Sequence, residues 1–514
     1  MEPLEVTRSK VELTPDPRRV VTRPYLPAEV RPGMGGSRVQ RLVDRVLALP
    51  TDAIAPTLAD VRARFAHRHE DLDAALEDSF AQIHAIAEIP RGLPRETRML
   101  LAAYFVHEYS IEAAALTNPS IVAAPYQAGV PAGWVRVIVS LRGVGEGHIS
   151  SIQLRTGLVG PGGEVRIDEP GPPLLGRRYP PLFDKRVFVA ELNELIASSQ
   201  DVEQAIDSHH ATEERRRSPV EVAMASLPER FTMSDLDEML RGFDLPGVPP
   251  DATALARSTI HWLADSNYEL AYPAGSQLSQ RVLFPVGPAE SHGMEDARFV
   301  RFTQEDGSAM YYGTYTAYDG FHVLPQLIET QDFSTFRIAT LSGSAARNKG
   351  IAIFPRRIDG RFVALARYDA ENNHLMWSDH VRVWEETQRV QVPSRPWELM
   401  QIGNAGAPIE TEAGWLVITH AVGPMRTYAL GAILLDLHEP HRVLGHLPEP
   451  LLIPDDDERD GYVPNVVYSC GQIVHDGVLV IAYGASDTVT RFASLPVDAL
   501  LTALTSPTAA PPPR

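Results

Sequence analysis

A short charged stretch, from Ser291 to Phe299, combines residue types that suit acid–base chemistry. It places two adjacent carboxylates, Glu295 and Asp296, beside Arg298, at the start of a strand-like run. Neighbouring charges can hold a carboxyl group at a pKa that is useful for proton transfer, so the stretch is a candidate acid–base centre. A solvated surface loop would have a similar composition, and the stretch alone does not separate the two interpretations.

The composition is that of an ordinary globular protein. Hydrophobic residues make up 44% and charged residues 22% of the 514 positions, which suggests one large domain with appendages or two to three domains. A net charge of -19 argues against a nucleic-acid-binding surface. A single cysteine, Cys470, rules out an internal disulfide framework and fits a reducing compartment. With no signal-peptide pattern and no bilayer-length apolar run, we expect a cytoplasmic protein without a nucleic-acid or membrane partner.

The N-terminal part of the chain contains two kinds of sequence pattern. Residues 1–37 are rich in proline, arginine and glycine and lack any period, which predicts an extended arm able to lie on another surface. Three- and four-residue spacing of apolar residues then predicts helices from about residue 38 to 115, the last of them a largely buried helix over 96–115. That helix would carry His107, Glu108 and Glu112 within five positions, a spacing that does not by itself define a metal site.

A second block of helical periodicity, from about residue 186 to 268, interrupts strand-rich sequence and is interpreted as an insertion or a lid. The predicted organisation is an arm and helical region over 1–115, a main domain over 116–504 that contains this insertion, and a disordered proline-rich tail over 505–514. The candidate helices of the insertion cover 190–206, 218–225, 234–241 and 252–264.

The strand-rich sequence repeats itself. Residues 134–142 and 148–155 predict a hairpin, because the glycine-containing turn between them lacks the spacing of a phosphate-binding loop and a strand follows it. From Arg281 to about residue 500, a strand, a tight turn and a second strand recur four times at intervals of roughly 50 to 60 residues, the period of a propeller blade. With the hairpin as a fifth unit, we predict a mainly β fold, a five-bladed β-propeller with an N-terminal helical extension and a helical insertion; a β-sandwich is the alternative.

The second strand of each unit ends at, or soon reaches, a polar residue. Because equivalent strand ends of a propeller converge on its axis, these residues would line one funnel, with aromatic side chains nearby to stack on sugar rings. The polar residues are Arg142, Tyr315 with Asp319, Arg367, His420 and Asp487, and the aromatic ones are Tyr312, Tyr318, Trp377, Tyr428 and Tyr462. The predicted ligands are an anion and a polyol.

From about Asn118 to Leu500, apart from the insertion, the chain resembles glycoside hydrolase family 130, the five-bladed propeller β-mannoside phosphorylases and β-mannosidases. Gly293–Arg298 resembles the family's Gly-x-x-Asp-Pro-Arg signature, and Lys349–Pro355 resembles its Lys-Asn-x-x-Leu-Phe-Pro segment. Further segments that match in order are Asn118–Val122, Ser140–Arg142, Ile402–Ile409, Thr419–Val422, Tyr428–Asp436, Gly461–Gly471 and Tyr483–Thr488.

The resemblance implies that Asp296 is the general acid and that it protonates the glycosidic oxygen through a hydroxyl of the bound mannose. Inorganic phosphate, the co-substrate, would attack the anomeric carbon with inversion and give α-mannose 1-phosphate, without a cofactor or a metal. Phosphate is already an anion, so no second carboxylate is needed as a base, whereas an inverting hydrolase needs one. The implied phosphate-binding residues are Lys349, Arg367, His420 and Tyr428, and the implied substrate-binding residues are Asn118, Arg142, Glu295, Arg298, Asp319 and Asp487.

Three positions depart from the family pattern. Ala297 replaces the signature proline, Gly350 replaces an asparagine, and Gln401 stands where phosphorylases commonly carry a lysine, which removes one charge from the implied phosphate site. The first alternative is therefore an inverting β-mannosidase, and the second is a non-catalytic propeller that binds glycans. Structural roles also stay open, as a buried Arg142–Asp487 pair or a core histidine at 420. The candidate bases of a hydrolase are Asp369, Glu371 and Asp379. Linkage, acceptor sugar and homo-oligomer formation are not determined by the sequence.

Overall fold

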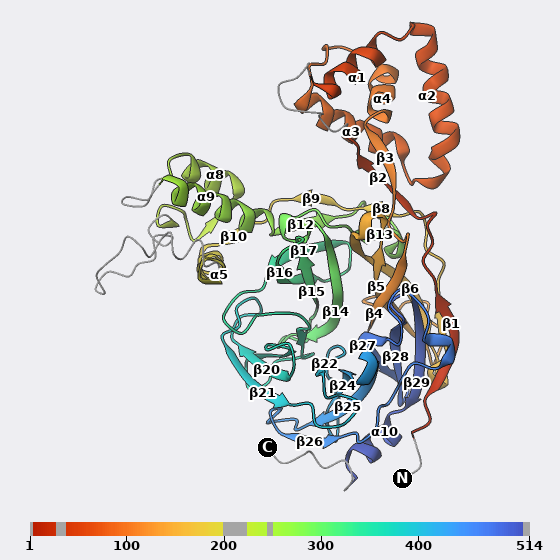
Figure 1. Ribbon diagram of the computed structural model, residues 1–514, viewed down its shortest axis with the longest axis vertical. Coiled ribbons are helices and arrows are strands. Elements are labelled where there is room, and N and C mark those ends of the chain that lie inside the picture. The colour runs from red at the N-terminus through yellow and green to blue at the C-terminus, as the bar shows by residue number, and fades with distance from the viewer. Residues whose placement is uncertain (1–3, 27–36, 199–223, 244–249, 507–514) are drawn as a thin grey trace.

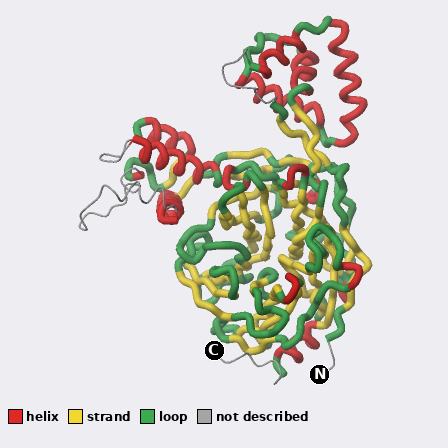
Figure 2. Tube along the Cα trace, in the orientation of Figure 1, coloured by secondary structure: helices red, strands yellow, loops and turns green. Residues whose placement is uncertain are grey.

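The computed structural model describes residues 4–26, 37–198, 224–243 and 250–506. Figure 1 shows a β-rich body, a helical unit that projects from one end of it, and a second helical group at its side. Figure 2 shows the same division, with the helices concentrated in the two projecting groups and the body made of strands and loops. The fold is mainly β, as predicted. The predicted tail over 505–514 and the candidate helix 218–225 lie largely outside the described residues.

The N-terminal helical unit consists of α1 (Arg38–Leu47), α2 (Thr51–Phe65), α3 (Leu72–Ile86) and α4 (Arg95–Ala103). Its apolar residues pack on one another in a core of their own, which includes Val43, Leu58, Leu76 and Leu100. Caps fix two of the helix starts, because the side chain of Ser37 accepts from the backbone N–H of Gln40 and a second cap, Asp71, begins α3. The helical periodicity from residue 38 therefore predicted these elements correctly.

The predicted helix over 96–115 is wrong beyond Ala103. The chain continues instead as β3 (Val106–Ser110), which pairs with β2 (Val20–Pro24) of the arm, and β4 begins at Ala115. A partner strand some 85 residues earlier in the chain thus overrides the local helical pattern, which sequence periodicity cannot anticipate. His107 and Glu108 are consecutive in a strand and point to opposite faces. These two side chains and Glu112 therefore do not share one face of a helix.

The third of these side chains, Glu112, forms a buried ionic triad that fastens the arm to the body. Its Oε1 accepts from Arg19 Nε at 2.8 Å and from Arg155 Nη2 at 2.6 Å, and its Oε2 accepts from the backbone of Asp16 at 3.2 Å. Arg19 belongs to the arm and Arg155 to the body, so one carboxylate neutralises cations from both. Upstream of it, β1 (Thr7–Leu13) runs along the edge strand β29 (Figure 1), which confirms an extended arm lying on another surface.

The strands of the body form successive antiparallel groups along the chain. The first is β4 (Ala115–Ala123), β5 (Val135–Val144) and β6 (Ser150–Val159); the second is β14 (Gly293–Thr303), β15 (Ala309–Tyr318), β16 (Val323–Thr330) and β17 (Thr335–Thr340). The third is β18 (Ala352–Ile353), β19 (Phe362–Ala366), β20 (Asn373–Ser378) and β21 (Glu386–Gln391). The fourth is β22 (Gln401–Asn404), β23 (Ile409–Thr411), β24 (Gly414–Val422), β25 (Tyr428–Leu435) and β26 (Val443–His446). The fifth is β27 (Val467–His475), β28 (Val478–Ala485) and β29 (Val489–Pro496), followed by α10 (Val497–Leu504).

These groups confirm the predicted hairpins, from the one over 134–155 to the turn before Val478. The first two groups belong to one larger sheet, which is joined where Gly293 pairs with Ser150 and is extended by short strands. Those strands are β7 (Val165–Ile167), β8 (Leu174–Leu175), β9 (Arg177–Tyr179), β12 (Tyr268–Ala271) and β13 (Arg281–Leu283). Among the described strands, no sheet closes on itself. No helix in the described ranges is long and apolar enough to cross a membrane.

The first strands of three groups carry the same irregularity. In β14 the pairing shifts between Glu295 and Arg298, so that two residues oppose one on β15, and equivalent two-residue bulges occur in β4 at Asn118 and in β27 after Tyr468. The three strands pack against one another, and Ser120 Oγ in β4 accepts from the backbone N–H of β14 at 3.1 Å. A β-bulge bends its strand and re-aims a side chain. The bulges therefore lie together at one place in the body.

The close approach of these strands depends on a small residue. A Cβ atom added at Gly471, just after the bulge of β27, would lie 2.3 Å from Ser120 Oγ and 3.1 Å from Ser120 Cα. A side chain at this position would push β27 away from β4. The glycine is therefore part of what brings the bulges together.

The helical insertion has its own core and lies against an edge of the body. It contains α5 (Lys185–Ser198), α8 (Met233–Arg241) and α9 (Pro250–Asp265), together with a short hairpin of β10 (Phe183–Asp184) and β11 (Arg230–Phe231). Phe183, Phe188 and Phe231 pack ring against ring at its centre, with Phe183 and Phe231 stacked at 5.1 Å. The predicted helices at 234–241 and 252–264 are confirmed, and the one at 190–206 is confirmed as far as Ser198.

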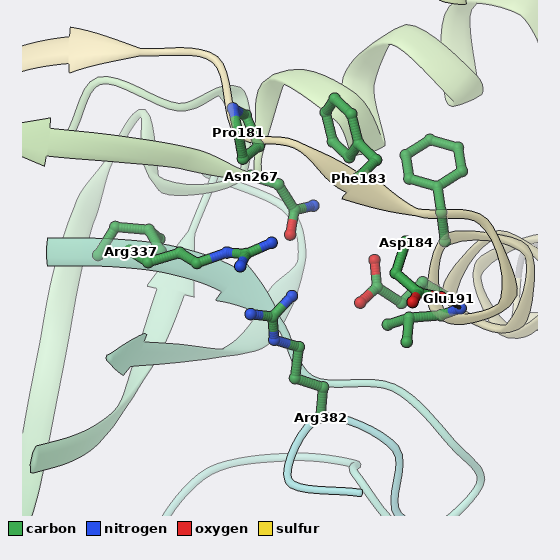
Figure 3. Close-up of a pocket in the computed structure, with 10 residues that line it drawn as sticks. Pro181, Phe183, Asp184, Glu191, Asn267, Arg337 and Arg382 are labelled. Carbon is green, nitrogen blue, oxygen red and sulfur yellow. Dashed lines mark hydrogen bonds between the residues drawn. The ribbon is translucent and has the colours of Figure 1, made fainter. Parts of the chain in front are cut away.

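A small hollow lies between α5 and the body (Figure 3). The guanidinium groups of Arg337 and Arg382 enter it from the body, and the carboxylates of Glu191 and Asp184 face them from the insertion. Glu191 is buried, and this burial raises its pKa to about 8 although the two arginines oppose the shift. Arg382 is itself held by Glu329 at 2.6 Å. The carboxyl of Glu191 therefore stays largely protonated at neutral pH.

This burial predicts a pH-dependent stability. The pKa of Glu191 is raised on folding from the ordinary 4.5 to about 8, so the folded state binds an extra proton between these values and loses that advantage as pH rises through about 8. We expect Glu191→Gln to remove this loss, which makes the variant more stable relative to wild type by about 3 kcal/mol at pH 9 compared with pH 6. Urea unfolding at several pH values measures it.

The matched control for this prediction is Glu194→Gln, which changes a more exposed carboxylate on the same helix. Its stability difference from wild type should stay constant with pH. Parallel pH profiles for wild type and Glu191→Gln would contradict the prediction.

Candidate active site

The bulge in β14 determines how the predicted acid is presented. Asp296 occupies its first position with a φ of 55°, in the left-handed region that aspartate tolerates better than most residues. Two residues on, the Arg298 guanidinium donates from Nη1 to the backbone carbonyl of Asp296 at 2.8 Å and so closes the bulge. The hydroxyl of Tyr468, from β27, donates to Asp296 Oδ2 at 3.3 Å. The carboxylate is thereby held between two strand groups.

Four cations surround this carboxylate and decide its charge. Burial raises the pKa of Asp296, but the positive charges of Arg298 and Arg142 offset the effect, and Lys349 and Arg367 add to them. The result is a pKa below the usual range for aspartate. Asp296 is therefore ionised in the free protein, and the charges near it are mainly positive.

Glu295, the other carboxylate of the stretch, binds two of those cations. Its Oε1 lies 2.6 Å from Arg142 Nη2 and its Oε2 lies 3.0 Å from Lys349 Nζ. Arg142, which was predicted to bind sugar, and Lys349, which was predicted to bind phosphate, thus meet on one side chain. The Arg142–Asp487 ion pair proposed as a structural alternative does not form, since the carboxylate that contacts Arg142 is that of Glu295.

Asp487 lies near the same cations and forms no ion pair with any described residue. Burial and the negative charge of Asp296 raise its pKa to about 6, while Arg142 and Arg426 oppose the shift. Its φ of 49° again places a polar residue in the left-handed region. The two acids therefore titrate in different pH ranges. Asp296, with its lowered pKa, is ionised at neutral pH, and Asp487 becomes protonated below about pH 6.

His420 is neutral in the free protein. Its Nδ1 lies 2.8 Å from the backbone carbonyl of Asn404 and must carry the proton, because a carbonyl only accepts. Burial, followed by the charges of Arg367 and Arg298, lowers the pKa of the imidazole to about 3. Its Nε2 is then an acceptor, and it is buried without a hydrogen-bond partner among the described residues. His420 is thus not a satisfied core histidine, and it carries no positive charge in the free protein.

Arg367 completes this side of the site. Its Nε is buried and, like the Nε2 of His420, has no hydrogen-bond partner in the part of the chain that the structure describes. Gly350 lies between Arg367 and Arg298, since a Cβ added there would be 4.0 Å from Arg367 Cβ and 3.8 Å from Arg298 Nη2. An unpaired buried polar group is costly unless a ligand or water satisfies it. The unpaired atoms of Arg367 and His420 therefore indicate a binding site for a polar ligand.

Two further predicted residues lie at the edge of this set. Tyr428 begins β25 and contacts Tyr468 ring to ring at 6.2 Å. Asn118 occupies the bulge of β4 with a φ of 47°, and its buried Oδ1 has no hydrogen-bond partner in the described ranges. Asn118 thus lies in a bulge, and Tyr428 lies in a strand that packs against β27.

Asp319 is not joined to the others by any contact in the described part of the chain. Its Oδ1 accepts from the backbone N–H groups of Phe321 and His322, at 2.8 and 2.6 Å, in the turn after β15. An aspartate that begins a turn satisfies its side chain locally. Two predicted funnel residues are also placed elsewhere: Tyr315 donates to the buried Glu290, and Tyr312 packs in the core on Phe302.

Sequence reasoning missed Tyr468 as a site residue. It lies within a matched motif, but the motif gave no reason to select it over its neighbours. The structure places its hydroxyl 2.6 Å from Arg298 Nη2 and its ring 4.8 Å from that of His420. The sequence shows no pattern that predicts the bulge in β27, and the alternation of side chains along the strand changes at that bulge.

The candidate bases for hydrolysis are engaged or exposed. Asp369 accepts from the backbone of Glu371 and from Asn372 in its own turn. Asp379 has a side chain that is 90% exposed and pairs with Arg361. Glu371 is exposed. None of the three contacts Asp296 in the described residues.

The bulges predict the effect of restoring the signature proline. Ala297 follows Asp296 in the bulge of β14 as Pro119 follows Asn118 in that of β4, and both preceding residues have similar positive φ angles. Ala297→Pro should therefore fold normally and gain about 0.4 to 1 kcal/mol by restricting the unfolded chain. Thermal unfolding measures it, and Ala346→Pro, at a buried position outside the bulges, is the control expected to destabilise. A loss of stability in Ala297→Pro comparable with the control would contradict the equivalence.

Comparison with known proteins supports the resemblance seen in the sequence. A family model described as beta-1,4-mannooligosaccharide phosphorylase, of the glycoside hydrolase 130 group, matches residues 276–506. A 1,2-beta-oligomannan phosphorylase of Thermoanaerobacter sp. (strain X514) is 35% identical over 232 residues, which cover 43% of this chain and 73% of that protein. A beta-1,2-mannobiose phosphorylase of Listeria innocua is 32% identical over 216 residues, 40% of this chain and 58% of that protein.

A solved structure of beta-1,2-mannobiose phosphorylase from Listeria innocua, in complex with beta-1,2-mannobiose, aligns with a TM-score of 0.44 at 19% identity. The alignment covers 77% of this chain and 93% of that one. On the sequence matches, the chain belongs to glycoside hydrolase family 130.

Proposed function

We propose that the protein is an inverting β-mannoside phosphorylase that releases α-mannose 1-phosphate from a manno-oligosaccharide. The observation that carries this proposal is one ionised acid among four cations, with buried atoms on Arg367 and His420 that have no hydrogen-bond partner in the described part of the chain. None of the three candidate bases contacts this acid among the described residues. The matched relatives are named as phosphorylases of β-mannosides. Inorganic phosphate is the co-substrate, and no other cofactor is proposed.

Phosphate binding would change the charge state of the acid. In the free protein the surrounding cations keep the pKa of Asp296 low, and a phosphate anion bound to Arg367 and Lys349 would offset their charge. The pKa of Asp296 would then rise, so the carboxyl would hold a proton when both substrates are in place. Asp296 would pass this proton to the glycosidic oxygen through a mannose hydroxyl while phosphate attacks the anomeric carbon from the opposite face.

Lys349 must exchange partners in this mechanism. In the free protein its ammonium lies 3.0 Å from Glu295, which competes with phosphate for it. Arg367 pairs with no carboxylate within the described ranges, so we assign it the first contact with phosphate and Lys349 a contact formed on binding. The neutral Nε2 of His420 would accept a hydrogen bond from a protonated phosphate oxygen. Tyr428 would complete the phosphate side, while Asn118, Arg142, Glu295, Arg298 and Asp487 would serve the sugar.

We also propose that the five strand groups are the blades of a five-bladed β-propeller, which form a catalytic domain over 116–504. Supporting this, β4 of the first group packs against both β14 of the second and β27 of the fifth. The arm strand β1 pairs with β29 and would supply the outer strand of the last blade. Radial blades leave only short edges, which suits a chain of such short strands.

The test of the function is phosphate dependence. We expect β-mannobioses of at least one linkage to give mannose 1-phosphate only when inorganic phosphate is present, as measured by chromatography of the products. Asp296→Asn should lower this rate by about 100-fold or more, the usual contribution of a general acid. Asp379→Asn, which changes an exposed carboxylate, should leave the rate unchanged. Free mannose released at the same rate without phosphate would show hydrolysis and contradict the proposal.

A further inference from the structure

Tyr468 connects the two sides of the site. Its hydroxyl contacts Arg298 and Asp296, and its ring contacts the imidazole of His420 at 4.8 Å and the ring of Tyr428 at 6.2 Å. It reaches this position because it directly precedes the bulge of β27, opposite Gly484. The side chain is 8% exposed, so it is a buried part of the site and not a wall open to solvent.

The direction of the two hydrogen bonds follows from the donor inventory. Arginine only donates, so Arg298 Nη2 donates to the tyrosine oxygen at 2.6 Å. The hydroxyl proton is then directed to Asp296 Oδ2, 3.3 Å away. Burial raises the pKa of Tyr468 above its usual value, and the hydroxyl keeps its proton at any working pH. A chain of donors thus runs from Arg298 through Tyr468 to Asp296.

Within the described residues, this hydroxyl is the one hydrogen-bond donor recorded on the Asp296 carboxylate. Arg298 uses its other nitrogen, Nη1, on the backbone carbonyl of Asp296. The backbone of the acid is therefore fixed by the arginine and its carboxyl group by the tyrosine. The tyrosine hydroxyl contacts Oδ2, and no side-chain or backbone donor to Oδ1 is found among the described residues.

We propose that Tyr468 is a positioning residue for the acid, which orients the Asp296 carboxyl so that Oδ1 faces the substrate hydroxyl. The proposal rests on the phosphorylase function for the substrate involved, but the contact itself exists in the free protein. Removing the hydroxyl would leave Asp296 free to rotate about its side-chain bonds, and misorientation of a catalytic group by small distances lowers the rate without changing binding.

The test is Tyr468→Phe, which keeps the ring contacts and removes only the hydroxyl. We expect kcat to fall by about 10-fold or more, part of the usual range for a general acid, with KM for phosphate and for the mannoside changed by less than about threefold. The alkaline limb of the kcat profile should move to higher pH, because the carboxylate loses a donor that favours its charged form.

The control is Tyr311→Phe, which removes another buried tyrosine hydroxyl, one that donates to the backbone of Ala123 at 2.8 Å outside the site. It should leave kcat and its pH profile unchanged. An unchanged kcat and pH profile in Tyr468→Phe, an effect on KM alone, or a loss matched by Tyr311→Phe would each overturn the proposal.

A second measurement keeps the inference independent of the function. The ionisation of Asp296 can be followed by carboxyl ¹³C NMR of labelled protein, with the signal assigned by its loss in Asp296→Asn. Tyr468→Phe should raise the pKa of that carboxyl, and an unchanged value would contradict the proposal even if wild type proves to be a hydrolase. Absence of phosphate-dependent product from wild type would instead overturn the proposed function alone.

Discussion

The site depends on one backbone feature, the two-residue β-bulge repeated in β4, β14 and β27. A regular strand would turn Asp296 to one face of its sheet with a φ near that of its neighbours, and its carboxylate would not meet Tyr468. In the bulge the residue takes a φ of 55°, and Arg298 holds its carbonyl. The equivalent bulges aim Asn118 and Tyr468 from the other two strands, and the small Gly471 lets these strands approach.

Charge is the second constraint. Four cations near Asp296 would repel one another in the free protein if Glu295 did not bind two of them. Glu295 thus has a double consequence: it stabilises the empty site and competes with the anion that the site is proposed to bind. The neutral His420 fits the same logic, because a fifth positive charge among buried arginines would be costly, and Arg367 and Arg298 lower its pKa for this reason.

Local sequence patterns predicted the elements that depend on local interactions. The turns at Gly307 and Gly477 and the helices from residue 38 were identified because turn residues and apolar spacing act within a few positions. Most candidate site residues were found through ordered motifs, whose segments the fold brings together. The family was likewise recognisable from those motifs, and the matches to relatives confirm it.

The predictions fail where residues that are distant in the sequence determine the structure. The strand at Val106 forms because β2 pairs with it. The role of the buried Glu112 depends on its ion pairs with arginines from the arm and from β6. Asp319 accepts hydrogen bonds within its own turn, and its predicted contact with the sugar stays a prediction. Tyr468 was not predicted as a site residue, because no local sequence pattern predicts the bulge beside it, which turns the tyrosine toward the acid.

The central claim is that the cations around Asp296 form a phosphate site, and calorimetric titration with inorganic phosphate tests it most directly. The account predicts that wild type binds phosphate and that Arg367→Gln weakens this binding by about 10-fold or more, as expected for a lost charged hydrogen bond of 1.5 to 3 kcal/mol. Arg357→Gln, which changes an arginine that donates to the carbonyl of Gly360 in its own turn and lies over the Phe362 ring, should bind like wild type. Equal phosphate affinity in Arg367→Gln and wild type, or no binding to wild type, would contradict the account.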